Sequence, residues 1–168
     1  MPEATLHSRL RAFLAAHNTM TLATVGPDAA PYAAAVFYAA DEDLRLFFLS
    51  SPNSRHSLAI EHDPRVAATI QADNQEWQEI QGIQIVGTAR EVHGTAELAH
   101  ATRIYAARFD FLAGLLDQSG SGPAALRGPL ASSRFYVLQP TWIRLIDNTV
   151  GFGYKEEGKL VNGELVNW

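Results

Sequence analysis

The sequence predicts a single domain that is mainly β, an antiparallel barrel with helices packed outside it. Strand-like segments follow one another with no regular alternation of strand and helix, which argues against a Rossmann-type sheet. The long strand pattern at 80–92 contains Gly82 and Gly87, and glycine inside a strand indicates the bulge or bend that a closing barrel needs. The chain has 168 residues, of which 47% are hydrophobic, and no internal boundary is visible. We therefore expect one domain over residues 1–168 with one large core.

The first third of the chain predicts a helix and three strands. Apolar side chains recur every three to four positions over residues 3–17, which predicts a helix with one buried stripe. The β-rich stretch 19–40 is divided by a Gly-Pro-Asp turn and predicts a hairpin. The strand at 44–49 is apolar on both faces, so we expect it to be buried on both sides.

A short helix is predicted next, from Ser51 to about Glu61. Ser51 is a suitable N-cap, and Pro52 is favoured at the first helical position. Residues 66–71 are rich in β-branched side chains and predict a strand, which a polar loop at 72–79 follows.

The last third predicts one more helix and further strands. Thr95 is expected to cap the helix, and the Gly-, Pro- and Ser-rich stretch 117–133 is expected to be flexible. Residues 134–146 predict a strand that is broken at Pro140. The Gly-rich tail from Asn148 predicts a short hairpin.

Composition excludes several classes of function. The 13 Lys and Arg residues against 18 Asp and Glu residues give a net charge of −5, which leaves no cationic surplus for nucleic acid. The absence of cysteine excludes disulfides, a thiolate nucleophile and Cys-held metals. No apolar run approaches the roughly 18 residues of a membrane span, and the N-terminus lacks a signal-peptide pattern. We expect a cytoplasmic protein with no membrane partner.

Two motif matches carry little weight. Residues 153–159 fit G-x4-G-K, but Leu160 stands where a nucleotide-binding loop needs Ser or Thr, so a β-turn is predicted instead. The six histidines include no pair at the i, i+4 spacing that places two imidazoles on one helical face, and we predict no metal site.

The informative stretch is the run SSPNSRH at residues 50–56. It joins a buried strand to a helix N-terminus, where free N–H groups and the helix dipole favour an anion. Its hydroxyls add donors, and Arg55 adds a fork that matches two phosphate oxygens. His56 adds either a charge or a neutral hydrogen bond. The loop fits a phosphate monoester, and a capped helix with a solvated Arg55 is the alternative that the spacing leaves open.

Residues 19–92 resemble the pyridoxamine 5′-phosphate oxidase-like family of FMN-binding split barrels. The resemblance rests on the segments PYAAAV at 31–36, LFFLSSPNSRH at 46–56, EHDPRV at 61–66 and IQIVGTA at 83–89. Together they give a strand, a Ser-Arg-Lys-type loop, a helix and a Pro-Arg-Val entry to the next strand. The resemblance implies a six- to seven-stranded antiparallel split β-barrel that forms a homodimer with FMN in the groove between subunits.

The resemblance also implies the cofactor site. One strand runs along the isoalloxazine ring, the end of the next lies near the ring and the ribityl chain, and the loop holds the 5′-phosphate. The residues in these positions are Ala34, Ala35, Val36, Phe37, Leu49, Ser50, Ser51, Ser54, Arg55 and His56. Gln84 is expected by the barrel mouth and is a further candidate to contact the flavin of the partner subunit, with a core or rim role as the alternative. Four further residues are less specific candidates for contact with the flavin: Trp77, Gln81, Trp142 and Phe152. Their alternative roles are packing in the core, at the barrel rim or in the dimer.

The sequence departs from the oxidase itself. Ala34 replaces an Arg of the second strand, His56 replaces a Lys, Ile146 replaces a Trp, and the C-terminal Arg-Leu-His-Asp-Arg substrate motif is absent. The chain is therefore similar to the small, poorly characterised bacterial members. We expect an FMN-dependent oxidoreductase that acts on a small molecule other than pyridoxamine 5′-phosphate, and no catalytic residue can be named.

Two other readings stay open. One is a non-catalytic flavin store, redox sensor or haem-binding barrel, because split barrels bind haem and deazaflavin as well as FMN. An axial haem ligand would come from His56, His62 or His93. The other is a structural dimer with an empty groove.

Overall fold

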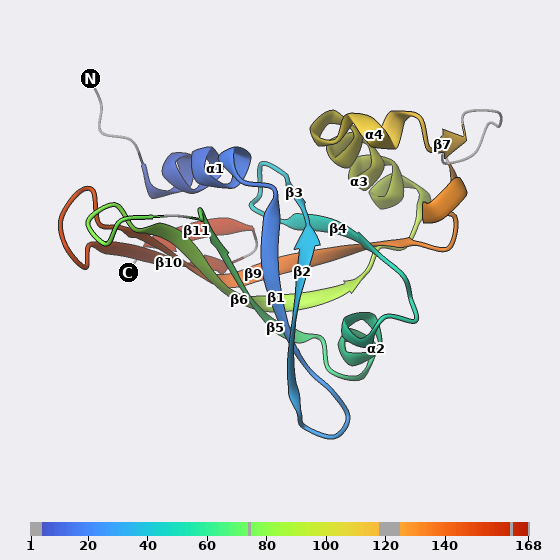
Figure 1. The fold of residues 1–168 in the computed structure, drawn as a ribbon, viewed down its shortest axis with the longest axis horizontal. Coiled ribbons are helices and arrows are strands. Elements are labelled where there is room, and N and C mark those ends of the chain that lie inside the picture. The colour runs from blue at the N-terminus through green and yellow to red at the C-terminus, as the bar shows by residue number, and fades with distance from the viewer. Residues whose placement is uncertain (1–4, 74, 118–124, 162, 168) are drawn as a thin grey trace.

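The computed structural model describes residues 5–73, 75–117, 125–161 and 163–167 (Figure 1). Its main element is a curled nine-stranded sheet in which every pairing is antiparallel. The strands of this sheet are β1 (Thr19–Val25), β2 (Pro31–Phe37), β3 (Ala39–Ala40), β4 (Leu46–Ser50), β5 (Arg65–Gln71), β6 (Gln81–Glu91), β9 (Arg134–Asp147), β10 (Lys155–Val161) and β11 (Glu164–Asn167).

Helices and a small second ladder surround the sheet. The helices are α1 (Leu6–Ala16), α2 (Arg55–His62), α3 (Thr95–Arg108) and α4 (Asp110–Ala113), with a short 3-10 turn at Gly128–Leu130. The second ladder pairs β7 (Leu116–Asp117) with β8 (Ala125–Leu126). In Figure 1, α1, α3 and α4 lie on one side of the strands and α2 lies on the other. No helix among the described residues is long and apolar enough to cross a bilayer.

The sheet runs in the order β11-β10-β9-β6-β5-β1-β2. The long strand β9 makes the barrel split, because one of its edges pairs with β4 over Arg134–Leu138 and with β10 over Trp142–Ile146. Its other edge pairs with β6 along the whole strand. The antiparallel split-barrel fold predicted from the sequence is therefore confirmed.

The strand predicted to break at Pro140 is continuous, so that prediction is wrong. A register shift between Val86 and Gly87 of β6 lies opposite Pro140 and absorbs the irregularity. A Cβ atom on Gly87 would lie 2.2 Å from the main-chain oxygen of Gln139, so only glycine permits this close approach. The expectation of a bulge at Gly87 is confirmed.

The core forms two clusters of buried side chains. The first cluster fills the inside of the curled sheet beneath α1 and includes Leu10, Leu14, Leu22, Phe48, Ile85 and Ile143. The second cluster lies under α3 and α4 and includes Phe47, Ala101, Tyr105, Phe109, Leu112 and Val137. Because Phe47 and Phe48 belong to different clusters, β4 is buried on both faces, as predicted.

Several element boundaries differ from the sequence-based expectation. The short helix begins at Arg55 with Ser54 as its N-cap, and Ser51 instead lies in a turn closed by the Ser54 N–H. The cap of α3 is Gly94, whose φ of 83° suits glycine, and Thr95 is the first helical residue. The second strand of the predicted hairpin is interrupted at Tyr38, whose hydroxyl donates to the Leu14 carbonyl and fixes α1.

The remaining elements agree with expectation where they are described. The first helix covers Leu6–Ala16, and the tail forms the β10–β11 hairpin. Of the stretch 117–133 that was predicted to be flexible, residues 118–124 lie outside the described part. The residues that flank them form the β7–β8 ladder and the 3-10 turn.

Candidate functional site

The candidate site is a chain of hydrogen bonds where β4 ends and α2 begins. Ser50, the last residue of β4, is buried, and its Oγ lies 2.6 Å from His56 Nε2 and 3.0 Å from Ser54 Oγ. Ser54 Oγ in turn accepts from the Ser57 N–H at 3.2 Å and donates to Ser57 Oγ at 2.8 Å. These contacts fix the loop and the first turn of α2 as one unit.

His56 sits half-buried within this unit. Burial disfavours the charged imidazolium and lowers the pKa of His56 below its ordinary value of 6.5. The side chain is therefore neutral at pH 7. Of the two roles that the sequence leaves open, the structure favours the neutral hydrogen bond over the charge.

Arg55 is the exposed cation of the site. Its guanidinium carbon lies 4.8 Å from the centre of the Tyr32 ring, in cation–π contact. No ion pair with Arg55 occurs in the described part of the chain, whereas Arg65 pairs with Asp63 at 2.6 Å and Arg144 pairs with Glu157 at 2.6 Å. The guanidinium of Arg55 thus has its positive charge and its donors available.

The start of α2 also offers main-chain hydrogen-bond donors. The first N–H of α2 that finds an intrahelical partner belongs to Leu58, which donates to the Ser54 carbonyl. The N–H groups of Arg55 and His56 precede it and are among the donors that a helix start leaves unpaired. Two main-chain donors, a guanidinium fork and hydroxyl groups form a set that fits a phosphate monoester.

The strand β2 supplies a free main-chain edge. Among the described strands it pairs only with β1, and the Tyr38 N–H donates to the Asn18 carbonyl in register with that ladder. Because bonding direction alternates along an antiparallel strand, Ala33, Ala35 and Phe37 direct their N–H and C=O groups away from β1. This edge can therefore offer donors and acceptors to the polar rim of a flat ligand.

The structure does not place all eleven predicted residues on one surface. On β2, the side chains of Ala34 and Val36 are half-buried, and those of Ala35 and Phe37 are exposed on the other face. Leu49 points to the second cluster, on the face of β4 opposite Ser50.

The structure brings together the serines of the loop with Arg55 and His56. Ser51 belongs to this group through its carbonyl, which accepts from the Ser54 N–H at 3.0 Å. Gln84 lies elsewhere, on the outer face of β6, where its side-chain oxygen is 3.5 Å from an Arg144 nitrogen.

The less specific candidates lie at other places. The rings of Trp77 and Phe152 meet edge to face with centroids 5.6 Å apart, and both side chains are largely exposed. Gln81 donates to a carboxylate oxygen of Asp147 at 3.0 Å, which gives it a structural partner. Trp142 stacks with the guanidinium of Arg144 at 4.8 Å.

The sequence analysis did not predict two residues of the site, Ser57 and Tyr32. Ser57 follows Ser54 at the i+3 spacing of a reciprocal helix cap, so its pattern was visible. Tyr32 contacts Arg55 only through the fold, since the two lie on different elements with no local pattern between them.

Comparison with known proteins decides the family. The sequence profile described as "Pyridoxamine 5′-phosphate oxidase" matches residues 6–147. The chain belongs to this family.

Among curated relatives of this family member are bacterial "UPF0306" proteins. The one from Yersinia pseudotuberculosis is 29% identical over 144 residues, which cover 85% of this chain and 86% of that protein. The one from Haemophilus ducreyi is 40% identical over 60 residues, only 35% of this chain and 41% of that protein.

Solved structures share the fold of this family member. A haem-binding protein from Mycobacterium smegmatis has a TM-score of 0.73 at 21% identity, over 95% of this chain but only 60% of the other. The haem storage protein from Vibrio cholerae has a TM-score of 0.63 at 20% identity, over 82% of this chain and 91% of the other. A putative pyridoxamine 5′-phosphate oxidase from Listeria innocua also has a TM-score of 0.63, at 18% identity, over 84% and 98%.

Proposed function

We propose that this protein binds FMN, with the 5′-phosphate at the start of α2, and works as an FMN-dependent oxidoreductase on a small molecule. The observation that carries the proposal is Arg55. Its guanidinium has no anionic partner in the described part of the chain, and Arg55 is the first residue of α2, directly after the Ser54 cap, where main-chain N–H groups are free. An anion with several acceptor oxygens satisfies this arrangement.

In this proposal the chain's own residues bind and orient the cofactor. Arg55 donates two N–H bonds to the phosphate, the main-chain N–H of His56 adds a third, and the Ser54 hydroxyl joins this shell when its proton turns from Ser57 Oγ to the phosphate. The outward main-chain groups of Ala33, Ala35 and Phe37 face the polar rim of the flavin ring. Bound FMN supplies hydride or electron transfer, and the protein contributes position and electrostatics.

A homodimer is part of the proposal. The outer face of the sheet exposes small and apolar side chains on adjacent strands, among them Ala23, Ala33, Ala35, Ala67 and Val86. A face of this kind is typical of an interface, because it loses little side-chain entropy when it is covered. Ala67→Arg should give monomers in light scattering. If that variant and the wild type are both dimers, the interface lies elsewhere.

Oxidation of pyridoxamine 5′-phosphate is not expected. Ala34 offers no positive charge on β2, and the C-terminal Arg-Leu-His-Asp-Arg motif of the oxidase is absent from the sequence. We therefore propose a different small-molecule substrate. Turnover of pyridoxamine 5′-phosphate at an ordinary enzymatic rate, on the order of 1–10³ per second, would contradict this part of the proposal.

The decisive experiment compares FMN with riboflavin, which lacks the phosphate. Arg55→Ala should weaken FMN about 10- to 150-fold, the value of a charge-assisted bond of roughly 1.5–3 kcal/mol, and should leave riboflavin nearly unchanged. Arg55→Lys keeps the charge without the fork and should fall between the two. Arg65→Ala removes an exposed arginine that already pairs with Asp63 and is the matched control. Equal FMN affinity of wild type and Arg55→Ala would refute the phosphate site.

Haem binding is the second candidate. Structural neighbours of this chain are described as a haem-binding protein and a haem storage protein, and the first has a TM-score of 0.73. His56 is the candidate axial ligand with a neutral imidazole, whereas His62 and His93 are exposed at helix ends. The absorption spectrum of the purified protein separates the candidates, since a Soret band indicates haem and flavin bands indicate FMN.

A further inference from the structure

The helices α1 and α3 lie on the side of the strands away from α2 (Figure 1). Residues of both helices line a groove of about 590 Å³. Its volume falls within the roughly 300–1,000 Å³ of small-molecule sites. It shares no lining residue with the β4–α2 loop. Small and apolar side chains line its middle, namely Leu14, Ala15, Ala39, Ala40, Ile104 and Ala107.

The carboxylates on the acidic side of the groove already have arginine partners. The Asp41 carboxylate is only 4% exposed and accepts from Arg45 Nε at 2.8 Å and from two main-chain N–H groups. Asp43 also lies 4.0 Å from the Arg45 guanidinium, and Glu42 pairs with Arg11 at 3.6 Å. The two arginines offset two of the three carboxylates, so a single negative charge remains on this side of the groove.

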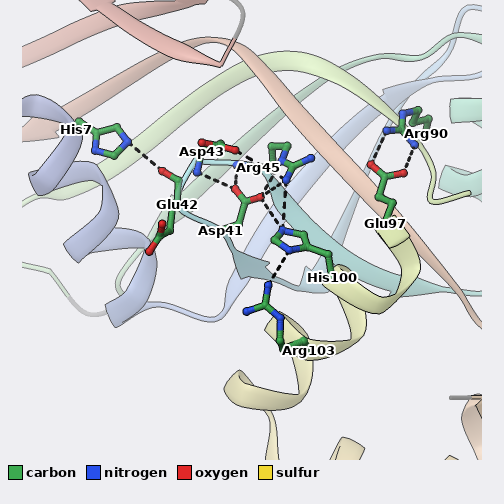
Figure 2. Close-up of polar contacts among 9 residues, drawn as sticks. All are labelled: His7, Asp41, Glu42, Asp43, Arg45, Arg90, Glu97, His100 and Arg103. Carbon is green, nitrogen blue, oxygen red and sulfur yellow. Dashed lines mark hydrogen bonds and ion pairs between the residues drawn. The ribbon is translucent and has the colours of Figure 1, made fainter. Parts of the chain in front are cut away.

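On the opposite wall, His100 links Asp41 to Arg103 (Figure 2). His100 Nε2 lies 3.2 Å from the Asp41 carboxylate, and Arg103 Nη2 lies 3.0 Å from His100 Nδ1. A carboxylate only accepts and a guanidinium only donates, so the contacts with Asp41 and Arg103 favour a proton on Nε2 and leave Nδ1 as the acceptor, while Arg45 Nη2, a donor bound to the same carboxylate, lies 3.3 Å from Nε2. His100 is thus a positioning residue that holds the Arg103 guanidinium at the groove.

The α3 wall keeps an excess of positive charge. Within the described part of the chain, Arg103 contacts no carboxylate, and four of its five N–H donors remain for a ligand. Arg108 is bound to the carbonyls of Ala15 and His17 at the end of α1, which are not charged. Both arginines line the groove.

We propose that this groove binds a small organic anion with an apolar body. The acid group, a carboxylate or a phosphate monoester, would lie on Arg103, and the apolar ring or chain would lie over Ala39, Ala40 and Ala107. The inference goes beyond the proposed flavin function and does not rest on it, because no residue is shared between the two sites.

Calorimetric titration of the purified protein tests the proposal with 1-naphthoate, 1-naphthyl phosphate and neutral 1-naphthylmethanol. Both anions, or one of them, should bind at least about tenfold more tightly than the alcohol, since a charge-assisted hydrogen bond is lost without the acid group. The ratio between the two anions distinguishes a carboxylate site from a phosphate site.

Variants then locate the binding. Arg103→Gln should weaken the preferred anion about tenfold or more, and Ala107→Trp should abolish its binding by filling the groove. Arg65→Gln, an exposed arginine outside the groove, is the matched control and should have no effect. The proposal is overturned if neither anion binds, if the alcohol binds equally well, or if Arg103→Gln has no effect. Loss of binding in Arg55→Ala instead would assign the anion to the β4–α2 loop.

Discussion

Gly87→Ala tests the close approach of β6 to β9 at the register shift. A Cβ atom at this position would lie 2.2 Å from the Gln139 oxygen and 3.0 Å from both the Gln139 carbonyl carbon and Pro140 Cα. All three are main-chain atoms, so no side-chain rotation relieves the overlap. Because β6 and β9 pair along their whole length, the two strands must move apart at the centre of the sheet. Overpacking typically costs about 1–3 kcal/mol, and we expect a loss of unfolding free energy of about 3 kcal/mol here.

Urea unfolding of ligand-free protein at one fixed concentration measures this loss, and the melting temperature should fall by about 6–12 °C. Two other glycines serve as controls. Gly82→Ala places its Cβ 3.2 Å from the Ile70 oxygen and should cost less, whereas Gly151→Ala meets no atom within 4 Å and should stay within about 0.5 kcal/mol of wild type. The reasoning is refuted if Gly87→Ala is as stable as Gly151→Ala.

Three further predictions follow from single side chains. Burial alone would raise the pKa of Asp147, but hydrogen bonds from Thr149 and Gln81 hold this pKa below the ordinary 3.8. The ionised Asp147 carboxylate therefore stabilises the folded state above pH 3.8, and this stabilisation is lost as the pH falls through the lowered pKa of the folded protein. Asp147→Asn should flatten acid unfolding in that range, and an unchanged acid limb would contradict it. The hydroxyl of Thr24 is buried without a hydrogen-bond partner in the described structure, so Thr24→Val should stabilise by about 1 kcal/mol, and a lower urea midpoint would argue against this. Because the pKa of His56 is lowered, FMN affinity should rise only below about pH 6.5. In fluorescence titrations, His56→Gln should remove the part of this rise that comes from imidazole protonation, and identical pH profiles would exclude the His56 imidazole from the phosphate shell.

The charges of the two sites differ in how they are held. At the β4–α2 loop, the Arg55 guanidinium packs against the ring of Tyr32. Tyr32 is uncharged, so the N–H donors of Arg55 stay free. In the groove, Arg103 is held through the Asp41–His100 link, whose carboxylate is itself neutralised by Arg45. In both places the fold orients an arginine without neutralising its charge with a carboxylate. For this reason we propose that both the β4–α2 loop and the groove bind anions.

The sequence by itself determined the features that depend on neighbouring residues. Alternation and apolar stripes predicted the strands and helices, the double-sided apolar run at 44–49 predicted that β4 is buried on both faces, and Gly87 marked the bulge. The segment SSPNSRH predicted a capped helix start with a cluster of donors, although the cap proved to be Ser54 instead of Ser51. These properties are local, because capping and periodicity depend on residues only a few positions apart.

Only the tertiary structure decided which distant residues meet. No local pattern places Tyr32 against Arg55, or His100 between Asp41 and Arg103, because each contact joins different elements of the chain. The sequence predicted a strand break at Pro140, but β9 is continuous there because Gly87 lies opposite Pro140 on β6 and permits a close approach of the two strands. Leu49 and Ser50 are adjacent in sequence yet face different clusters, since successive side chains of a strand point to opposite sides and the packing of α3 and α4 decides what covers each side.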